Sequence, residues 1–374
     1  MRIALALLLG VHGLIHLAGF VKGFGFAEVA ALKLPIGRTA GVLWLVAAIG
    51  FLASAVMLHA APTRWWLVGL PALLVSQTLV VLFWSDAKFG TILNVIVLVP
   101  LVMAIFEARP GSFRSMYEKE SRRHLALLPA FAPLVTEGDL APLPPLVQMY
   151  LRRSGVVGKP RVLGFRARFH GRFRNGLDSS WMRFTSEQYN FVEPSARLFL
   201  MRASLWGIPM DGYHDFVGAA AHFRIRLLSL LQVVDGHGPI MDQSETVTVF
   251  NDLCVLAPGT LIDLPVRWTT LDVRSVRGVF TRGDQTISAV LTFDPQGDLV
   301  DFISEDRYFS PDGKTGEKLP WLTPMRDHRD FGGVRLPARG DATWKTPKGD
   351  FVYGEFNLDE IEYIPAAASA TDSP

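Results

Sequence analysis

The stretch Phe165-Arg166-Ala167-Arg168-Phe169-His170-Gly171-Arg172-Phe173-Arg174 alternates apolar and basic residues without interruption. Successive side chains of a β-strand point to opposite faces, so this period of two predicts a strand with one buried face and one solvated face. A sheet of such strands covers an apolar interior on one side. The stretch therefore indicates the fold of the C-terminal part of the chain.

Further strands follow in quick succession. We predict them at 181–191, 196–205, 210–217, 222–230, 244–250, 268–272, 275–282, 285–293, 299–308, 333–346 and 350–363. The connections at 282–284 and 294–298 combine Gly and Asp, which is typical of hairpin turns and makes the sheet mainly antiparallel. One helix is expected between strands, at 252–262, with Asp252 as its N-cap.

These elements predict a soluble, mainly antiparallel β domain over residues 142–364. Its inner positions are rich in Phe, Leu, Val and Trp, which favours a curved sheet or half-open barrel with one or two covering helices. The helices either fill the concave face as an ordinary core or leave part of it open as a hydrophobic pocket. Residues 365–374 are expected to form a disordered tail.

The N-terminal part is of another kind. Four apolar stretches, at 3–20, 39–59, 65–84 and 90–106, contain no Lys, Arg, Asp or Glu. A bilayer core about 30 Å thick needs roughly 20 apolar helical residues to cross it, so residues 1–108 are predicted to form a four-helix transmembrane bundle. Residues 109–141 are charged and Pro-rich, which is typical of a semi-rigid connector.

The basic residues near the span ends predict the orientation. They fall into two groups: Arg2, Arg64, Arg109, Arg114, Lys119, Arg122 and Arg123 on one side, and Lys22, Lys33, Arg38 and Lys88 on the other. Because the cytoplasmic side carries the excess of Lys and Arg, the richer first side is expected to face the cytoplasm. We therefore expect a multi-pass inner-membrane protein with both termini, and the soluble domain, in the cytoplasm.

Charge and cysteine content limit the classes of partner that the sequence predicts. The net charge of +2 comes without a basic block, so no nucleic acid is expected. The only cysteine, Cys254, excludes an intramolecular disulfide. The expected partners are the lipid bilayer and a lipid or other apolar small molecule. The sequence predicts no bound cofactor and identifies no protein partner.

Two histidines lie inside the first span. His12 and His16 are four residues apart and share one helix face. Ionisable groups inside a membrane are candidate functional sites, and two imidazoles at this spacing could ligate a haem or a metal ion. The alternative is that both histidines bond to neighbouring helices and stay neutral.

A first polar cluster in the soluble domain comprises Asp211, His214 and Asp215, and His222, His237 and Asp242 follow later in the chain. Carboxylates and an imidazole close in sequence suit metal ligation or general acid and base catalysis. Hairpin turns and solvated strand faces are the alternative explanation of the same residues.

A second polar cluster contains Glu245, Asp252, Asp301, Asp306, Arg307 and Trp321. Adjacent strands could bring Glu245 or Asp301 opposite Arg307. Such an ion pair would fix the strand register or bind a polar headgroup.

The order of short motifs along the chain carries a resemblance. After the Pro-rich segment come Gly212-Tyr213, Glu245-Thr246-Val247, Asn251-Asp252, Ala257-Pro258, Trp268, Asp306-Arg307-Tyr308, Trp321-Leu322-Thr323-Pro324, Trp344 and Tyr353-Gly354. Over 143–363 this order resembles an uncharacterised bacterial family of conserved hypothetical proteins, some with a similar membrane anchor. That resemblance implies no activity. The strand pattern is also similar to lipoprotein-carrier folds of the LolA and LolB kind, which implies a half-open barrel that binds acyl chains.

Three functions remain open at this point. The sequence favours a membrane-anchored module that binds a lipid or other apolar ligand in the curved sheet. The alternatives are a structural or signalling adaptor, and a hydrolase acting on a membrane-associated substrate through His214, Asp215, Glu245 and Asp306. Binding is favoured over catalysis because no known nucleophile, zinc or phosphate-loop spacing is present.

Overall fold

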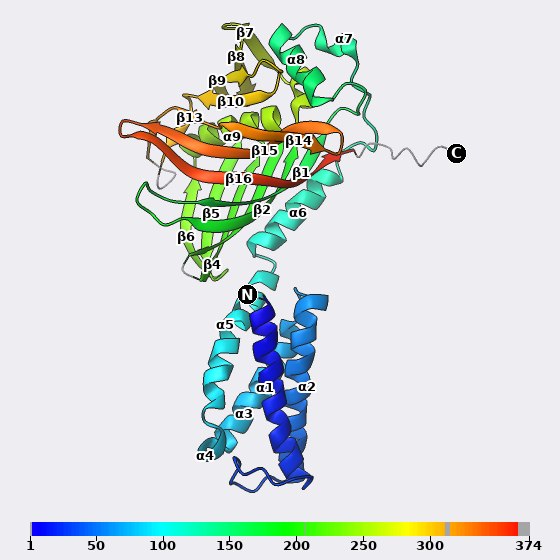
Figure 1. The fold of residues 1–374 in the computed structure, drawn as a ribbon, viewed down its shortest axis with the longest axis vertical. Helices are drawn as coiled ribbons and strands as arrows, with labels where there is room; N and C mark the ends of the chain where they lie inside the picture. Colours follow the sequence, from blue (N-terminus) through cyan, green and yellow to red (C-terminus); the bar gives the residue numbers. More distant parts are fainter. Residues whose placement is uncertain (1, 206, 311–314, 366–374) are drawn as a thin grey trace, which may run out of the picture. The chain divides into compact units, whose positions relative to one another are not determined.

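The computed structural model describes residues 2–205, 207–310 and 315–365. The chain divides into two compact units, Met1–Ser112 and Phe113–Pro374 (Figure 1). Residues 366–374 of the predicted tail lie outside the described residues.

The first unit consists of apolar helices. They are α1 (Arg2–Gly23), α2 (Arg38–Ala60), α3 (Trp66–Leu82), α4 (Trp84–Ala87) and α5 (Gly90–Ala108). By length and composition, α1, α2 and the helix that begins at Gly90 could cross a membrane, and α3 is apolar but shorter, with 17 residues. Large apolar side chains such as Ile3, Leu7 and Val56 are 65–70% exposed, which is the arrangement expected of a lipid-facing surface.

Close packing joins α1 to α2. A Cβ built on Gly19 would lie 2.1 Å from the Trp44 ring, so only glycine allows this approach. Small residues at helix contacts are typical of membrane bundles, because they let the helix backbones approach closely.

The second unit is a strand-rich domain. Its elements are α6 (Phe113–Leu125), α7 (Glu137–Leu140), α8 (Pro145–Ser154), β1 (Gly164–Phe173), β2 (Met182–Phe191), β3 (Ala196–Leu205), β4 (Ile208–Val217), β5 (Ala220–Leu227), β6 (Leu231–His237), α9 (Pro239–Leu256), η1 (Pro258–Ile262), β7 (Val266–Thr270), β8 (Ser275–Arg282), β9 (Gln285–Phe293), β10 (Leu299–Ser304), β11 (Tyr308–Phe309), β12 (Glu317–Lys318), β13 (Trp321–Leu322), β14 (Met325–Phe331), β15 (Val334–Thr346) and β16 (Gly349–Ile364).

Fourteen of the described strands form one antiparallel sheet. Its order is β6-β5-β4-β3-β2-β1-β16-β15-β13-β10-β9-β8-β7, with β14 paired to β15, while β11 and β12 form a separate pair. The sheet curves around α9 (Figure 1). The predicted curved antiparallel half-barrel with covering helices is therefore confirmed; β6, β12, β13 and β14 were not predicted.

The alternating stretch forms β1, as predicted. Phe165 and Ala167 are buried, whereas Arg166 donates to Glu187 (2.9 Å) and Arg168 to Glu360 (2.8 Å) on the other face. The period of two thus separates an apolar inner face from an outer face of ion pairs.

The prediction of a strand at 244–250 is wrong, because this segment lies within α9. Its Thr and Val residues favour strands, but the segment is buried on every side and therefore shows no amphipathic period. The helix begins after Gly238 with Pro239 at its first position. The Thr246 and Thr248 hydroxyls donate to carbonyls one turn back (2.9 and 3.1 Å), so these β-branched residues fit the helix. The predicted helix at 252–262 is the end of α9 followed by η1, and Asp252 is not its N-cap.

Part of the predicted connector packs on the domain. Phe113 and Tyr117 of α6 are buried against Leu198 and Tyr213 on the outer face of the sheet. The Tyr117 hydroxyl donates to Glu187 (3.0 Å). A charged helix with two aromatic residues four apart thus covers an apolar strip of strands.

Candidate functional site

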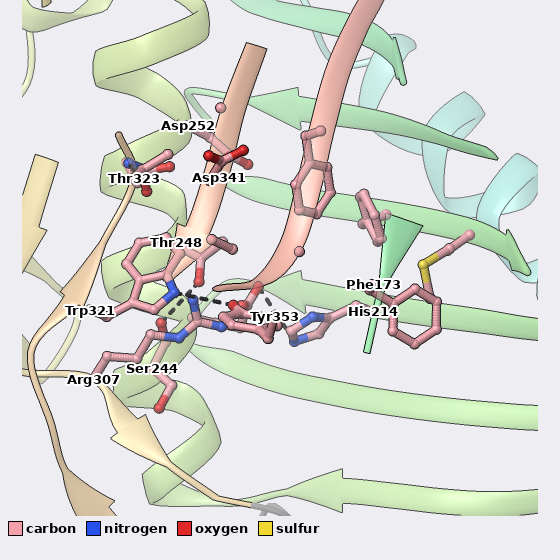
Figure 2. Close-up of a pocket in the computed structure, with 18 of the residues that line it drawn as sticks. Phe173, His214, Ser244, Thr248, Asp252, Arg307, Trp321, Thr323, Asp341 and Tyr353 are labelled. Atoms are coloured by element: carbon pink, nitrogen blue, oxygen red, sulfur yellow. Dashed lines mark hydrogen bonds and ion pairs between the residues drawn. The ribbon is translucent and has the colours of Figure 1, made fainter. Parts of the chain in front are cut away.

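A cavity of about 690 Å³ lies between α9 and the concave face of the sheet (Figure 2). This volume is typical of small-molecule sites. Its walls are mainly apolar and aromatic: Phe169, Phe173, Phe184, Phe199, Met201, Phe223, Ile225, Val234, Ile240, Met241, Phe309, Trp321, Trp344, Phe351, Tyr353 and Phe356.

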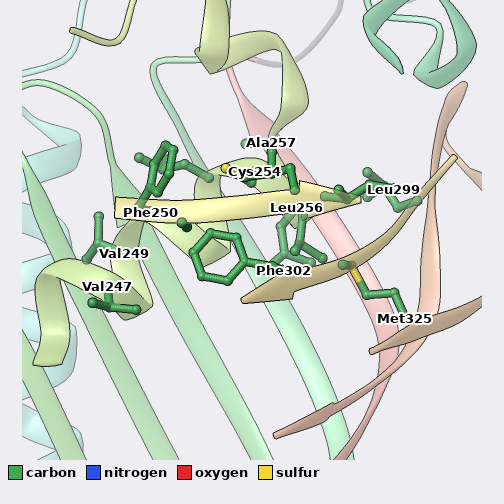
Figure 3. Close-up of a cluster of buried hydrophobic side chains, with 14 of the residues drawn as sticks. Val247, Val249, Phe250, Cys254, Leu256, Ala257, Leu299, Phe302 and Met325 are labelled. Atoms are coloured by element: carbon green, nitrogen blue, oxygen red, sulfur yellow. The ribbon is translucent and has the colours of Figure 1, made fainter. Parts of the chain in front are cut away.

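The helix α9 has two different sides. The residues that line the cavity recur at helical spacing: Ser244, Glu245, Thr248, Asn251, Asp252, Val255 and Leu256. The opposite side carries Val247, Phe250, Leu253 and Cys254, which belong to the solid core (Figure 3). There Phe250 stacks on Phe280 with ring centroids 5.0 Å apart and meets Phe302 edge-on at 5.8 Å. One side of the helix therefore fixes its position and leaves the other side for a ligand.

The floor of the cavity is a buried ion cluster. Arg197, 6% exposed, donates through Nη1 to Glu245 (3.2 Å) and through Nε to Asp252 (2.7 Å). The amides of Gln188 and Asn190 also donate to Asp252 (3.1 and 3.2 Å). Three donors thus converge on Asp252 Oδ2, whereas Glu245 Oε1 is buried without a hydrogen-bond partner among the described residues.

His214 of β4 completes the floor. Its Nε2 lies 3.4 Å from Glu245 Oε2. Burial lowers the pKa of His214 to about 4, against the pull of Glu245, so the imidazole is neutral at pH 7. Burial alone would raise the pKa of Glu245, but neighbouring positive charges, those of Arg197 and Arg307 among them, outweigh it and lower that pKa. The pair is therefore a carboxylate beside a neutral imidazole.

Arg307 lies at the same end of the cavity, beside Trp321 and Tyr353 (Figure 2). Its guanidinium stacks 4.3 Å from the Trp321 ring centroid and 5.6 Å from that of Trp344. Its Nε is buried and has no hydrogen-bond partner among the described residues. Trp321 Nε1 donates to the Tyr353 hydroxyl (3.1 Å), which holds the indole in place. Aromatic stacking thus positions a cation that keeps donor capacity for a ligand.

The second predicted cluster is only partly brought together. Glu245, Asp252, Arg307 and Trp321 line the cavity, whereas Asp301 and Asp306 do not. Asp306 accepts from the backbone and hydroxyl of Ser288 (2.7 and 3.2 Å). Burial raises the pKa of Asp301 to about 6.

The expected ion pair of Arg307 with Glu245 or Asp301 is not formed within the described parts of the chain. Glu245 is paired with Arg197 instead, a residue that the sequence reasoning missed. Arg197 shares the phase of Phe199 and Met201, which face the cavity, but the other phase of β3 is apolar as well, so alternation alone did not identify it.

The first predicted cluster is split by the alternation of β4. His214 lines the cavity, whereas Asp211 and Asp215 point to the opposite face. There Asp211 accepts from the Ser229 hydroxyl, and Asp215 pairs with Arg224. The three residues do not form one acid–imidazole site.

His12 and His16 bond to neighbouring helices of the first unit. His12 Nε2 donates to Asn94 Oδ1 (2.9 Å), and His16 Nε2 lies 2.9 Å from the Ser76 hydroxyl. Asn94 in turn donates to Gln77 (2.9 Å). In the described part of the chain no third metal-ligating side chain joins the two histidines.

Fold and site define a class: proteins with apolar N-terminal helices and a half-barrel domain that encloses a cavity. Residues 133–356 match DUF6544, a family of unknown function, and the chain belongs to this family. The resemblance to an uncharacterised family is thereby confirmed. No curated protein matches.

Three solved structures are similar to the chain. A putative outer membrane lipoprotein-sorting protein domain from Vibrio parahaemolyticus is 12% identical over 59% of this chain and 91% of that one, with a TM-score of 0.35. A LolA superfamily protein from Nitrosomonas europaea is 10% identical over 58% and 93%, with a TM-score of 0.34. A DUF1329 family protein from Desulfovibrio piger is 10% identical over 59% and 92%, with a TM-score of 0.35. Two of these neighbours are of the LolA and lipoprotein-sorting kind that the strand pattern resembled.

Proposed function

We propose that this protein is a membrane-anchored module that binds an amphipathic, lipid-like molecule in the cavity of its half-barrel. One observation carries the proposal: an aromatic cavity of about 690 Å³ ends in a floor of buried polar groups with unused hydrogen-bonding capacity. Burial of an apolar chain against these walls stabilises the complex by about 25 cal/mol per Å² of apolar surface. Hydrogen bonds from a polar end of the ligand to the unpartnered groups at the floor stabilise it further.

The charge of the floor supports a neutral polar end. Two guanidinium groups, Arg197 and Arg307, face two carboxylates, Glu245 and Asp252, and the imidazole of His214 is neutral. A free carboxylate or phosphate on the ligand would leave this balance with an excess buried charge. A hydroxyl or ester group suits it, since a hydroxyl donates to Glu245 and accepts from Arg307. The ligand class is therefore an acylated polyol or a similar uncharged lipid.

The membrane helices are proposed to keep this cavity beside its ligand source. We propose that α3 acts as a fourth span alongside the three longer apolar helices. The distribution of Lys and Arg supports a cytoplasmic position for both termini and the half-barrel. Fusion of phosphatase and fluorescent-protein reporters to the C-terminus tests this, and strong phosphatase activity would reverse the orientation.

Photolabelling tests the binding function on the full-length protein in lipid nanodiscs. The probe is a monoacylglycerol with a diazirine in its acyl chain. We expect labelled peptides from β3 and α9. Met201→Trp, which fills the cavity, should abolish this labelling, whereas Thr185→Trp on the exposed face of the neighbouring strand should not. Equal labelling of both variants, or label restricted to residues 1–112, would reject the proposal.

A hydrolase is the second candidate, favoured by the contact of His214 with Glu245 at the cavity floor. An imidazole beside a carboxylate is typical of general-base sites. Release of glycerol from the same probe, lost in His214→Gln while labelling persists, would support hydrolysis. A covalent adduct on the wild-type protein that still carries the glycerol ester, by mass spectrometry, would support binding alone.

A further inference from the structure

Three side chains that can ligate metal lie together on the outer face of β5 and β6. His222 and His237 are directly opposite each other in the antiparallel register. Their ring centroids are 5.2 Å apart. Asp235 precedes His237 by two residues on the same strand, so both side chains project from one face. One ligand atom from each of the three lies within 4.8 Å of the others.

From this geometry we propose that His222, Asp235 and His237 form a binding site for a divalent transition metal such as zinc. Zinc takes imidazole nitrogen and carboxylate oxygen at about 2.0–2.2 Å in a tetrahedral shell. The side chains of Asp235 and His237 are 52% and 54% exposed, so small rotations bring the donors to bonding distance. Calcium and magnesium prefer all-oxygen shells, so a site with two imidazoles selects against them.

Neighbouring charges leave the three donors available. Arg224 is the register partner of Asp235, where a cation would compete with a metal. Arg224 pairs instead with Asp215 on the other side. Asp215 is itself the register partner of His222, so the cation is held beside the site and neutralised there.

The site is separate from the ligand cavity. Phe223 and Val234, which alternate with the metal-site residues on the same two strands, line the cavity on the inner face. With three protein ligands, the fourth position of a tetrahedral metal stays open to water. A bound metal would also tie β6 to β5 and so protect the edge of the sheet.

The test uses full-length protein in detergent, purified with an affinity tag that lacks histidine and stripped with EDTA. Zinc binding is measured by competition with a chromogenic chelator, and metal per chain is measured after gel filtration. We expect one zinc per chain. Loss of an outer partner of a ligand typically costs about 10- to 100-fold in affinity, so His222→Ala and His237→Ala should each weaken binding by at least about tenfold. Cobalt should show the visible absorption of a four-coordinate ion.

His170→Ala is the matched control. It removes an imidazole that contacts a carboxylate, Asp359 (2.6 Å), on the same face of the sheet but without a second histidine opposite. Its zinc binding should equal that of the wild type. Absence of a stoichiometric zinc, or zinc retained with unchanged affinity in both His222→Ala and His237→Ala, would overturn the proposal. Unchanged circular dichroism of the variants shows that a loss of metal is not a loss of fold.

Discussion

Arg197→Met tests whether the ion cluster is an essential part of the cavity floor. Arg197 is the cation shared by Glu245 and Asp252, and all three side chains are buried. After its removal Asp252 keeps two amide donors, at 3.1 and 3.2 Å. Glu245 loses its bonded cation and keeps the contact with His214 at 3.4 Å and the charge of the more distant Arg307. The substitution therefore leaves one carboxylate partly satisfied and the other close to unsatisfied.

Removing one partner of a buried ion pair costs about 3–5 kcal/mol. At about 2–4 °C per kcal/mol for a domain of this size, the midpoint of unfolding should fall by about 6–20 °C. Additional Glu245→Gln and Asp252→Asn substitutions remove the stranded charges, so the triple variant should regain at least half of the loss.

Thermal melts of full-length protein in detergent, followed by the circular dichroism of the sheet, measure the effect. Arg168→Met is the control, since Arg168 is 45% exposed and its ion pairs with Glu187 and Glu360 lie on the outer face. Its effect should stay within about 1 kcal/mol. A loss below about 1 kcal/mol in Arg197→Met, or a triple variant no better than the single one, would refute the reasoning.

Three further outcomes are expected. His214 has a folded-state pKa of about 4, against an ordinary value of 6.5. Between these pH values the unfolded chain binds more protons, so the stability of the folded protein falls by up to about 3 kcal/mol as the pH drops. His214→Gln should flatten this part of a stability–pH curve, and an unchanged slope would contradict the lowered pKa. Asp301→Asn should stabilise the half-barrel at neutral pH by about 1–3 kcal/mol. Burial raises the Asp301 pKa to about 6, so the wild type loses stability as the pH rises from 3.8 through that value. Denaturant melts at neutral pH measure the change, and no gain in stability would mean that the carboxylate is solvated. Gly19→Leu should lower the yield of folded protein in gel filtration, because Trp44 occupies the space beside Gly19. Gly10→Leu should not lower it, because nothing lies within 4 Å of a Cβ added at Gly10. Equal yields of the two variants would contradict the packing of α1 on α2.

The half-barrel was predictable because local pattern and global fold agree in most of its strands. In β1 the apolar phase is buried and the basic phase pairs on the outer face, so one period gives both the strand and its orientation. The turns at 282–284 and 294–298 then give the antiparallel order of β8, β9 and β10. A fold can be predicted from its sequence where local pattern, turns and global topology agree in this way.

The strand β3 shows why the site was harder to predict. Its apolar phase, Leu198 and Leu200, lies on the outer face under α6. Its other phase, Arg197, Phe199 and Met201, lines the cavity. Because both faces are covered, the rule that apolar residues face inward assigns Arg197 to solvent. In the structure α6, which is distant in sequence, covers the face with Leu198 and Leu200, so Arg197 faces the cavity instead.

The wrong assignment of 244–250 hid how the predicted residues Glu245 and Asp252 are arranged. Glu245 and Asp252 are seven residues apart, an odd number, so in a strand their side chains would point to opposite faces. In a helix seven residues are almost two full turns, so both carboxylates project from one side of α9 and reach the same guanidinium, that of Arg197. The charged floor therefore exists only because a segment of β-branched residues is helical. No local period predicts this helix, because residues 244–256 are all buried and carry no amphipathic pattern.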